Sequence, residues 1–173
     1  MLSLAPTFDG RRTVPSKEVT DLMLELLQLT PQDKVMEIGT GSGYQTRRLA
    51  QTGAEIHSIE LEPYVDPTIP FGECVYLYHR DGFLGLPEVA PFTAIVATCG
   101  LTEIPAAWVD QLRPEGRIVV PIGRADAQRL ALFTKLQGHV SPKRIAAYVR
   151  FQMMRAPDER KPLKPVYKDR PEE

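Results

Sequence analysis

The chain has few of the residues that build metal centres and disulfide frameworks. Only two cysteines, Cys74 and Cys99, and three histidines occur among its 173 residues. Two cysteines make neither a disulfide framework nor, on their own, a four-ligand zinc site. The sequence therefore predicts no metal site, and we expect a reducing, cytoplasmic location.

An excess of charge of either sign and a long apolar run are also missing. Lys and Arg number 21 and Asp and Glu number 22, which gives a net charge of -1. Proteins that bind nucleic acids usually carry a basic excess, so the balance argues against that class. The longest uncharged apolar stretch, 89–102, falls short of the ~20 residues that span a bilayer. The N-terminus has no basic start followed by apolar residues, so no secretory signal is visible.

What is present is typical of one globular domain. Apolar residues make up 43% and charged residues 25% of the chain, as in soluble globular proteins. We expect a single domain over residues 1–155. Residues 156–173 are rich in proline and charge and cannot bury enough surface to offset their ordering entropy. We predict an extended tail there, with Tyr167 as its candidate docking residue.

Apolar residues change periodicity along the chain in the manner of alternating helices and strands. Helices are predicted over 17–29, 44–52 and 104–112, the first with Ser16 as its N-cap and the last packed on the sheet through Trp108. Strands are predicted over 34–38, 55–59, 75–78, 92–97 and 116–121, followed by an antiparallel pair at 130–135 and 145–151. The fold class is therefore α/β, a mostly parallel, doubly wound sheet closed by that C-terminal pair.

Three segments follow predicted strands, where ligands bind in such sheets. The first is a glycine-rich turn, 39–43, whose spacing is G-x-G-x-G, one residue tighter than the dinucleotide fingerprint. Backbone amides there and the following helix N-terminus suit an anionic group. Glu60 ends the next strand and is placed to accept both hydroxyls of a ribose, and Asp81 could accept from an exocyclic amine. The alternatives are a surface acid at Glu60 and a simple Asp-Gly turn at Asp81.

These motifs resemble the protein-L-isoaspartate O-methyltransferases. The resemblance runs from 37–46 through 81–82, 90–98, 103–105, 111–116 and 117–123, and it covers roughly residues 13–151. It implies a Rossmann-like class I methyltransferase fold, S-adenosylmethionine as cofactor, and methylation of the free carboxylate of isoaspartyl residues in damaged proteins. By that resemblance the cofactor is bound by Glu37, Gly39, Thr40, Gly41, Ser42, Gly43, Glu60, Leu61, Asp81 and Gly82.

The substrate side departs from the family pattern. The family carries a Thr-Ile-Ser segment before its first core helix, and this chain has Thr13, Val14 and Pro15 there. Proline replaces the serine and Ser16 comes one residue late. Thr13 and Ser16 are therefore the candidate catalytic residues, although Ser16 also fits the helix N-cap. Pro63, Pro67 and Pro70 replace the helix that normally separates the second and third strands.

Three functions stay open. The first is repair-type methylation of an isoaspartyl carboxylate, which is ionised at neutral pH and needs no general base. The second is methylation of another peptide or small molecule by a divergent enzyme, and the third is a module that binds the cofactor or a partner without catalysis. We expect no nucleic acid or membrane partner, and a homo-oligomer stays open. The missing helix predicts that the tail, a loop or a second subunit covers one face of the sheet.

Overall fold

The structure is a computed structural model, and it describes residues 7–8, 13–62 and 71–156. Its elements in chain order are β1 (Thr7–Phe8), β2 (Thr13–Val14), α1 (Lys17–Leu27), β3 (Lys34–Ile38), α2 (Tyr44–Ala50), β4 (Glu55–Glu60), β5 (Val75–His79), the 3₁₀ turn η1 (Gly82–Leu84), β6 (Phe92–Ala97), α3 (Ala106–Gln111), β7 (Leu112–Arg124), β8 (Ala127–Leu136) and β9 (His139–Val149). The predicted tail lies almost entirely outside the described residues.

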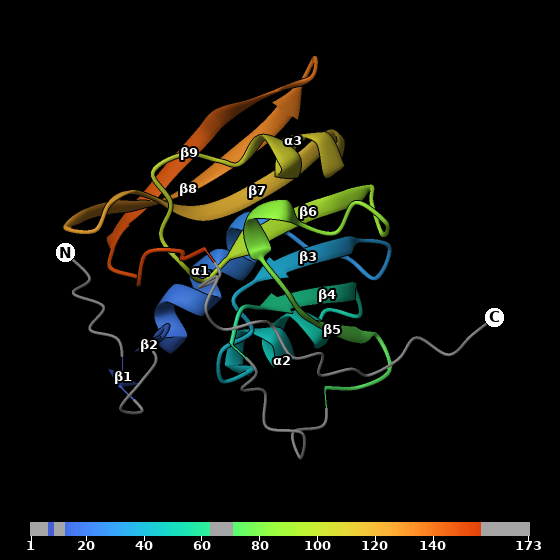
Figure 1. The fold of residues 1–173 in the computed structure, drawn as a ribbon, viewed down its shortest axis with the longest axis horizontal. Helices are drawn as coiled ribbons and strands as arrows, with labels where there is room; N and C mark the ends of the chain where they lie inside the picture. The colour runs from blue at the N-terminus through green and yellow to red at the C-terminus, as the bar shows by residue number, and fades with distance from the viewer. Residues whose placement is uncertain (1–6, 9–12, 63–70, 157–173) are drawn as a thin grey trace.

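A seven-stranded sheet forms the centre of the molecule (Figure 1), with the strand order β5-β4-β3-β6-β7-β8-β9. The strands from β5 to β7 are parallel, and β8 and β9 return antiparallel. The predicted fold class is thereby confirmed. The carboxyl ends of β3, β4 and β6 meet at one edge of the sheet, at the point where β4 lies on one side of β3 and β6, which follows β5 in the chain, lies on the other. That edge is where ligands bind in open α/β sheets.

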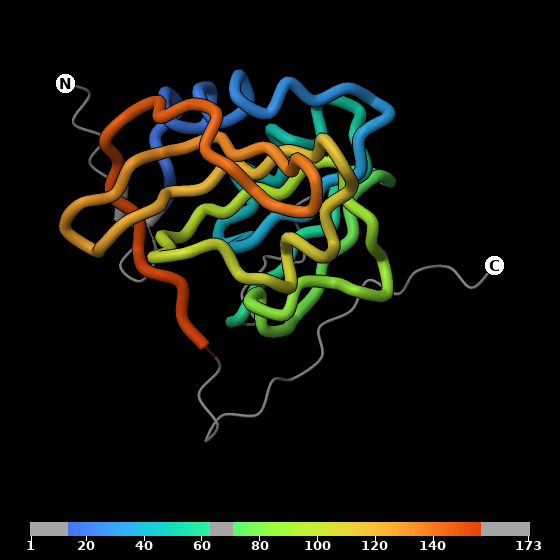
Figure 2. The backbone as a smooth tube through the Cα atoms, turned by 90° about the horizontal axis from the view of Figure 1, so that it is seen from above, coloured from blue at the N-terminus to red at the C-terminus, as the bar shows by residue number. Residues whose placement is uncertain are grey.

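Each face of the sheet carries its own apolar core. On one face α1 and α2 place Met23 and Leu49 against Val35 of β3 and Ile56 of β4. On the other face the segment between β5 and β6 and the helix α3 cover the sheet, with Leu86 and Trp108 fully buried. Figure 2 shows the two helices on one side of the sheet and the segment of residues 80–110 on the other. β6 is buried along its whole length because it lies between both layers.

The helix α1 begins and ends at residues with clear local causes. The Ser16 hydroxyl accepts a hydrogen bond from the amide of Val19 at 3.4 Å, so the predicted N-cap is confirmed. The helix ends at Leu27 because Gln28 adopts a left-handed conformation, with φ 48°. The predicted end at Leu29 was two residues too late. A non-glycine residue in that conformation gives no sequence signal for the helix end.

Other boundaries were also wrong by a few residues. The predicted helix 44–52 ends at Ala50, and the predicted helix 104–112 begins only at Ala106, after Pro105 as N-cap. The strands β7, β8 and β9 differ from their predicted ranges, because hairpin pairing extends β7 to Arg124 and ends β9 at Val149. The short antiparallel pair β1 and β2 was not predicted.

A cover was predicted for one face of the sheet, because the connection between β4 and β5 lacks a helix. On the face that also carries α1 and α2, Phe71 and Cys74 of that connection pack against the core that contains Ile56 and Val75. Residues 61–62 and 71–74, the described part of the connection between β4 and β5, are not helical. Pro63, Pro67 and Pro70, on which the prediction of a missing helix rests, lie outside the described residues. Cover by residues 157–173 remains a prediction, since that segment lies outside the described residues.

Candidate functional site

A cavity of about 340 Å³ lies at the carboxyl ends of β3, β4 and β6. Ile38 and Ile59, the buried residues near the ends of β3 and β4, form its apolar base. Of the residues predicted to bind the cofactor, the structure brings to this cavity Gly39, Gly41, Glu60, Leu61 and Gly82. Three separate turns therefore meet at one rim.

The glycine-rich turn connects β3 to α2 in a conformation that few side chains tolerate. Gly39, Gly41 and Gly43 have φ of 94°, 53° and 74°. A Cβ at Gly39 would lie 2.5 Å from the hydroxyl oxygen of Thr98, which itself donates to the Gly39 carbonyl at 2.6 Å. The turn thus passes close to the end of β6, and its backbone lines the cavity. Ser42 lies on the turn and accepts from the amide of Tyr44 at 3.3 Å.

The carboxylate of Glu60 lies at the cavity and is bonded to the backbone around it. One oxygen accepts from the amide of Gly41 at 2.7 Å and the other from the amide of Glu62 at 3.1 Å. The acid at the end of β4 therefore holds the glycine-rich turn and the segment after β4 at a fixed separation. Both of its oxygens are oriented by the protein, which suits recognition of a paired donor.

Glu37 lies beneath the turn, under α2, and does not line the cavity. Its Oε2 accepts from the hydroxyls of Thr46 and Ser58, each at 2.6 Å, and Ser58 is bonded in turn to Thr40 at 2.6 Å. Burial raises the pKa of Glu37 to about 7, against the hydrogen bonds from Ser58 and Thr46 that lower it, and the charge of Glu60 adds to the rise. Glu37 and Thr40 thus contact the cavity only through the turn they support.

The third turn follows β5 and is hydrogen-bonded to a side chain of α3. Asp81 caps η1 by accepting from the amide of Phe83 at 2.9 Å, so its carboxylate is engaged in the turn itself and is not among the lining residues. The carbonyl of Gly82 accepts from the indole of Trp108 at 2.8 Å. A Cβ at Gly82 would lie 2.7 Å from a methyl carbon of Ile38, so the position requires glycine.

Neither predicted catalytic residue is among the described residues that line the cavity. Ser16 caps α1 and is absent from the cavity lining. Thr13 belongs to β2, whose backbone pairs with β1, and its side chain is not described. The structure therefore does not bring Ser16 to the cavity and does not place the side chain of Thr13, and the role of both residues in catalysis stays a prediction.

Several lining residues were missed from the sequence. Thr98 and Cys99 follow β6. Their place at the cavity could have been predicted, because β6 is parallel to β3 and ends beside it at the same edge of the sheet. Burial, with a smaller contribution from the charge of Glu60, raises the pKa of Cys99 to about 12, so this residue is a neutral thiol at pH 7. Residues 152–155 also line the cavity, after a long excursion through the β8–β9 hairpin, and no local pattern indicates this.

Two kinds of structural feature are absent from the part of the chain that the structure describes. Among residues 7–8, 13–62 and 71–156, no group of three or more His, Cys, Asp or Glu side chains is arranged to hold a metal ion. Within those same ranges, no helix has the length and apolar character needed to cross a bilayer.

Known proteins share both the sequence and the architecture. A profile of the family described as protein-L-isoaspartate(D-aspartate) O-methyltransferase matches residues 5–154. The protein-L-isoaspartate O-methyltransferase of Gloeobacter violaceus is 38% identical over 136 residues, which cover 75% of this chain and 66% of that protein. Protein-L-isoaspartate O-methyltransferase 1 of an Anaeromyxobacter species is 40% identical over 121 residues, or 66% of this chain and 57% of that protein.

Two solved structures show the same fold. One, a protein-L-isoaspartate O-methyltransferase, has a TM-score of 0.72 and 27% identity, and the match covers 85% of this chain and 50% of that one. The other, a putative protein-L-isoaspartate O-methyltransferase of Plasmodium falciparum in complex with S-adenosyl-L-homocysteine, has a TM-score of 0.66 and 20% identity, and covers 85% and 79%.

Strand order, the glycine-rich turn and these likenesses define the Rossmann-like class I methyltransferase fold. Within this class the chain belongs to the protein-L-isoaspartate O-methyltransferase family, as its sequence motifs indicated. It spans 66% and 57% of the length of the two relatives compared, so it matches part of each of them.

Proposed function

We propose that the chain is an S-adenosylmethionine-dependent methyltransferase whose acceptor is the free carboxylate of an isoaspartyl residue in a peptide or protein. The observation that carries the proposal is the meeting of Gly39, Gly41 and Glu60 at one cavity. Family membership supports the same activity. So does the Plasmodium falciparum structure, which shares the fold and holds the demethylated cofactor.

The lining residues fit this cofactor. At Gly39 and Gly82 the space that a Cβ would need is taken by Thr98 and Ile38, so backbone forms the cavity wall at both turns. Glu60 would accept from the ribose hydroxyls, Leu61 and Gly82 would contact the adenine, and the turn at Gly39 and Gly41 would hold the amino-acid end. Of the other predicted contacts, Glu37 and Thr40 would act from beneath the turn.

The reaction asks little of the protein beyond alignment. When bound, the cofactor supplies an electrophilic methyl group on a sulfonium, which an acceptor displaces in line. A carboxylate acceptor is already ionised at pH 7, so no residue here has to remove a proton from it. Cys99, which lines the same cavity, keeps its proton at pH 7 and is therefore a poor competing acceptor.

Transfer of a labelled methyl group tests the activity. Purified protein is incubated with methyl-labelled S-adenosylmethionine and an isoaspartyl peptide, and with the same peptide carrying normal aspartate as the control. We expect base-labile label, released as methanol, on the isoaspartyl peptide alone. Absence of transfer to either peptide, under conditions where the cofactor binds, rejects the isoaspartyl acceptor.

A divergent acceptor is the second candidate, because Pro15 stands where the family has serine. The variant Pro15→Ser distinguishes an isoaspartyl acceptor from a divergent one. A gain of isoaspartyl activity in the variant over an inactive parent would show that this position has diverged. The cytoplasmic location and any homo-oligomer remain predictions.

Replacing Glu60 tests the cofactor assignment. We expect Glu60→Gln to bind S-adenosylhomocysteine about 10- to 100-fold more weakly. Glutamine replaces one carboxylate oxygen, which would accept a hydrogen bond from a ribose hydroxyl, with an amide nitrogen that can only donate. The matched control is Glu88→Gln, since Glu88 is half exposed and pairs only with Arg80 in the described structure. Titration calorimetry measures both variants. Equal affinity of Glu60→Gln and the parent would show that the ribose lies elsewhere.

A further inference from the structure

One wall of the cavity is built by the chain after β9. We call residues 151–155 the return segment, because there the chain leaves the hairpin and comes back to the central strands (Figure 2). Four of its residues line the cavity: Gln152, Met153, Met154 and Arg155. The segment is not part of the sheet, apart from an isolated bridge between Gly100 and Met153. Its position therefore depends on a few specific bonds.

The inner end of the return segment is held by the side chain of Gln128. In β8 the backbone of Gln128 is in register with Val149, where β9 ends. Beyond that point its side-chain amide takes over the pairing. Its nitrogen donates to the carbonyl of Phe151 at 3.0 Å, and its oxygen accepts from the amide of Phe151 at 2.7 Å. Both partners are buried, at 1% and 7% exposure, so water does not replace these bonds.

The same amide also reaches the cavity wall. The nitrogen of Gln128 lies 3.2 Å from the sulfur of Met153. A Cβ at Gly100 would lie 2.3 Å from that nitrogen, so the glycine leaves the space that the amide fills. Gly100 then bonds the middle of the segment through its backbone, donating to Gln152 at 2.7 Å and accepting from Met154 at 2.8 Å.

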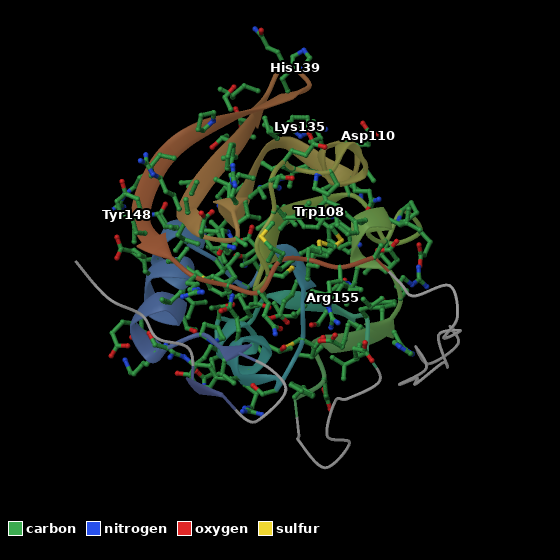
Figure 3. The ribbon with its side chains drawn as sticks, turned by 60° about the vertical axis from the view of Figure 1, so that its left-hand side comes forward. Trp108, Asp110, Lys135, His139, Tyr148 and Arg155 are labelled. Carbon is green, nitrogen blue, oxygen red and sulfur yellow. The ribbon has the colours of Figure 1, made fainter. Side chains whose placement is uncertain are left out.

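The outer end is held more weakly. Arg155, which is labelled in Figure 3, lies 3.9 Å from Glu62, and the two side chains are 70% and 48% exposed. An exposed ion pair of this kind contributes little to the free energy of folding. The segment is thus anchored firmly beside Phe151 and loosely where it meets the segment after β4. Gln128 itself does not line the cavity.

We propose that Gln128 is a positioning residue for cofactor binding: by holding Phe151 and Met153 it keeps the return segment in place as a wall of the cavity. The proposal rests on the proposed function, since it concerns the affinity of the same cavity for S-adenosylmethionine. A glutamine that touches no ligand then controls that affinity through the segment it anchors.

The test compares Gln128→Met with Thr93→Val. Methionine keeps the length and burial of the side chain but loses both hydrogen bonds. Thr93 is also buried, and it bonds Asp33 and Lys34 at the opposite end of the sheet, so its loss destabilises the fold away from the cavity. We expect Gln128→Met to bind S-adenosylhomocysteine about tenfold more weakly and Thr93→Val to bind within about twofold of the parent, at a temperature where both are folded.

Kinetics separate positioning from loss of folded protein. With the isoaspartyl peptide, Gln128→Met should raise KM for S-adenosylmethionine about tenfold with kcat within about threefold. A purely structural role would lower kcat with the active fraction and leave KM unchanged, and that outcome overturns the proposal. Should Gln128→Met not fold, Gln128→Glu keeps the acceptor for the Phe151 amide but loses the donor, and the same weakening is expected. A parent that binds no S-adenosylhomocysteine rejects the proposed function as well, whereas a parent that binds it with the same affinity as both variants overturns this proposal alone.

Discussion

Replacing Trp108 with alanine is expected to lower the free energy of unfolding by about 3–5 kcal/mol, the range for removing a large aromatic side chain from a core. Trp108, labelled in Figure 3, is fully buried and packs from α3 into the apolar core between that helix and the sheet. Its indole nitrogen also donates to the carbonyl of Gly82 at 2.8 Å. The substitution therefore removes both the packing of α3 and the support of one rim of the cavity.

The variant Trp108→Phe separates these two effects. Phenylalanine keeps much of the ring but leaves the carbonyl of Gly82 without its donor, at a cost of about 1–3 kcal/mol. Because Gly82 lines the cavity, we also expect weaker binding of S-adenosylhomocysteine by this variant. Asp110→Ala, on the exposed side of the same helix, is the control and should stay within about 0.5 kcal/mol of the parent.

Urea unfolding followed by circular dichroism measures these differences, since Trp108 is the single tryptophan and its fluorescence disappears with it. A loss in Trp108→Ala no larger than in Asp110→Ala would contradict the buried position of this side chain. A stability of Trp108→Phe equal to that of the parent would show that the bond to Gly82 contributes nothing.

The sequence was informative where a local pattern determines the structure. β6 reads as an unbroken apolar run because it lies between two layers, and its predicted bounds, 92–97, match the structure. Ser16 was recognised as an N-cap because a hydroxyl before an apolar stripe has that geometry. Glu60 was placed at the ligand-binding edge because the end of a parallel strand fixes its position.

The sequence was uninformative where contacts are distant along the chain. The return segment lies at the cavity, where it is bonded to Gln128 and Gly100, and neither residue is near it in sequence. Asp81 followed the third strand as expected, but its carboxylate is used as the cap of a turn, the alternative that its Asp-Gly pair had left open. Whether the Asp81 carboxylate caps the turn or faces a ligand depends on the position of the Phe83 amide, which the sequence does not specify.

The direction of the Glu37 side chain could have been predicted from the alternation of residues along β3. Alternate residues of a strand face the same side, so Glu37 points with Val35 toward the helical layer, away from Ile38 at the cavity. Its predicted role was carried over from the family motif, which states the residue but not its direction. A buried acid in this layer has a consequence for stability that can be measured.

Stability should fall as pH rises through the range in which the folded protein retains the proton of Glu37. The pKa of this carboxyl is raised from 4.5 to about 7, because burial disfavours its charged form. Below 4.5 both states hold the proton, between the two values only the folded state holds it, and above about 7 both have released it. Unfolding therefore becomes easier across that window, by about 3 kcal/mol in all.

Glu37→Gln removes this dependence, because glutamine has no proton to lose while its oxygen still accepts from Thr46 and Ser58. Other carboxyls also make the free energy of unfolding depend on pH. Burial alone would raise the pKa of Asp33, but hydrogen bonds from Thr93 and Thr30 and the charge of Arg117 hold that pKa low. These dependences on pH are shared by both proteins, so the difference between variant and parent isolates Glu37. We expect that difference to grow in favour of the variant by about 3 kcal/mol between about pH 4 and about pH 8.

Thr46→Val tests the cause of the shift. It removes a hydrogen bond that lowers the pKa of Glu37, so the fall in stability should extend to higher pH than in the parent. Urea unfolding at several pH values measures all three proteins. A difference between Glu37→Gln and the parent that stays constant with pH would mean that folding does not shift the pKa of this carboxyl, and that the layer under the glycine-rich turn is wetter than its packing indicates.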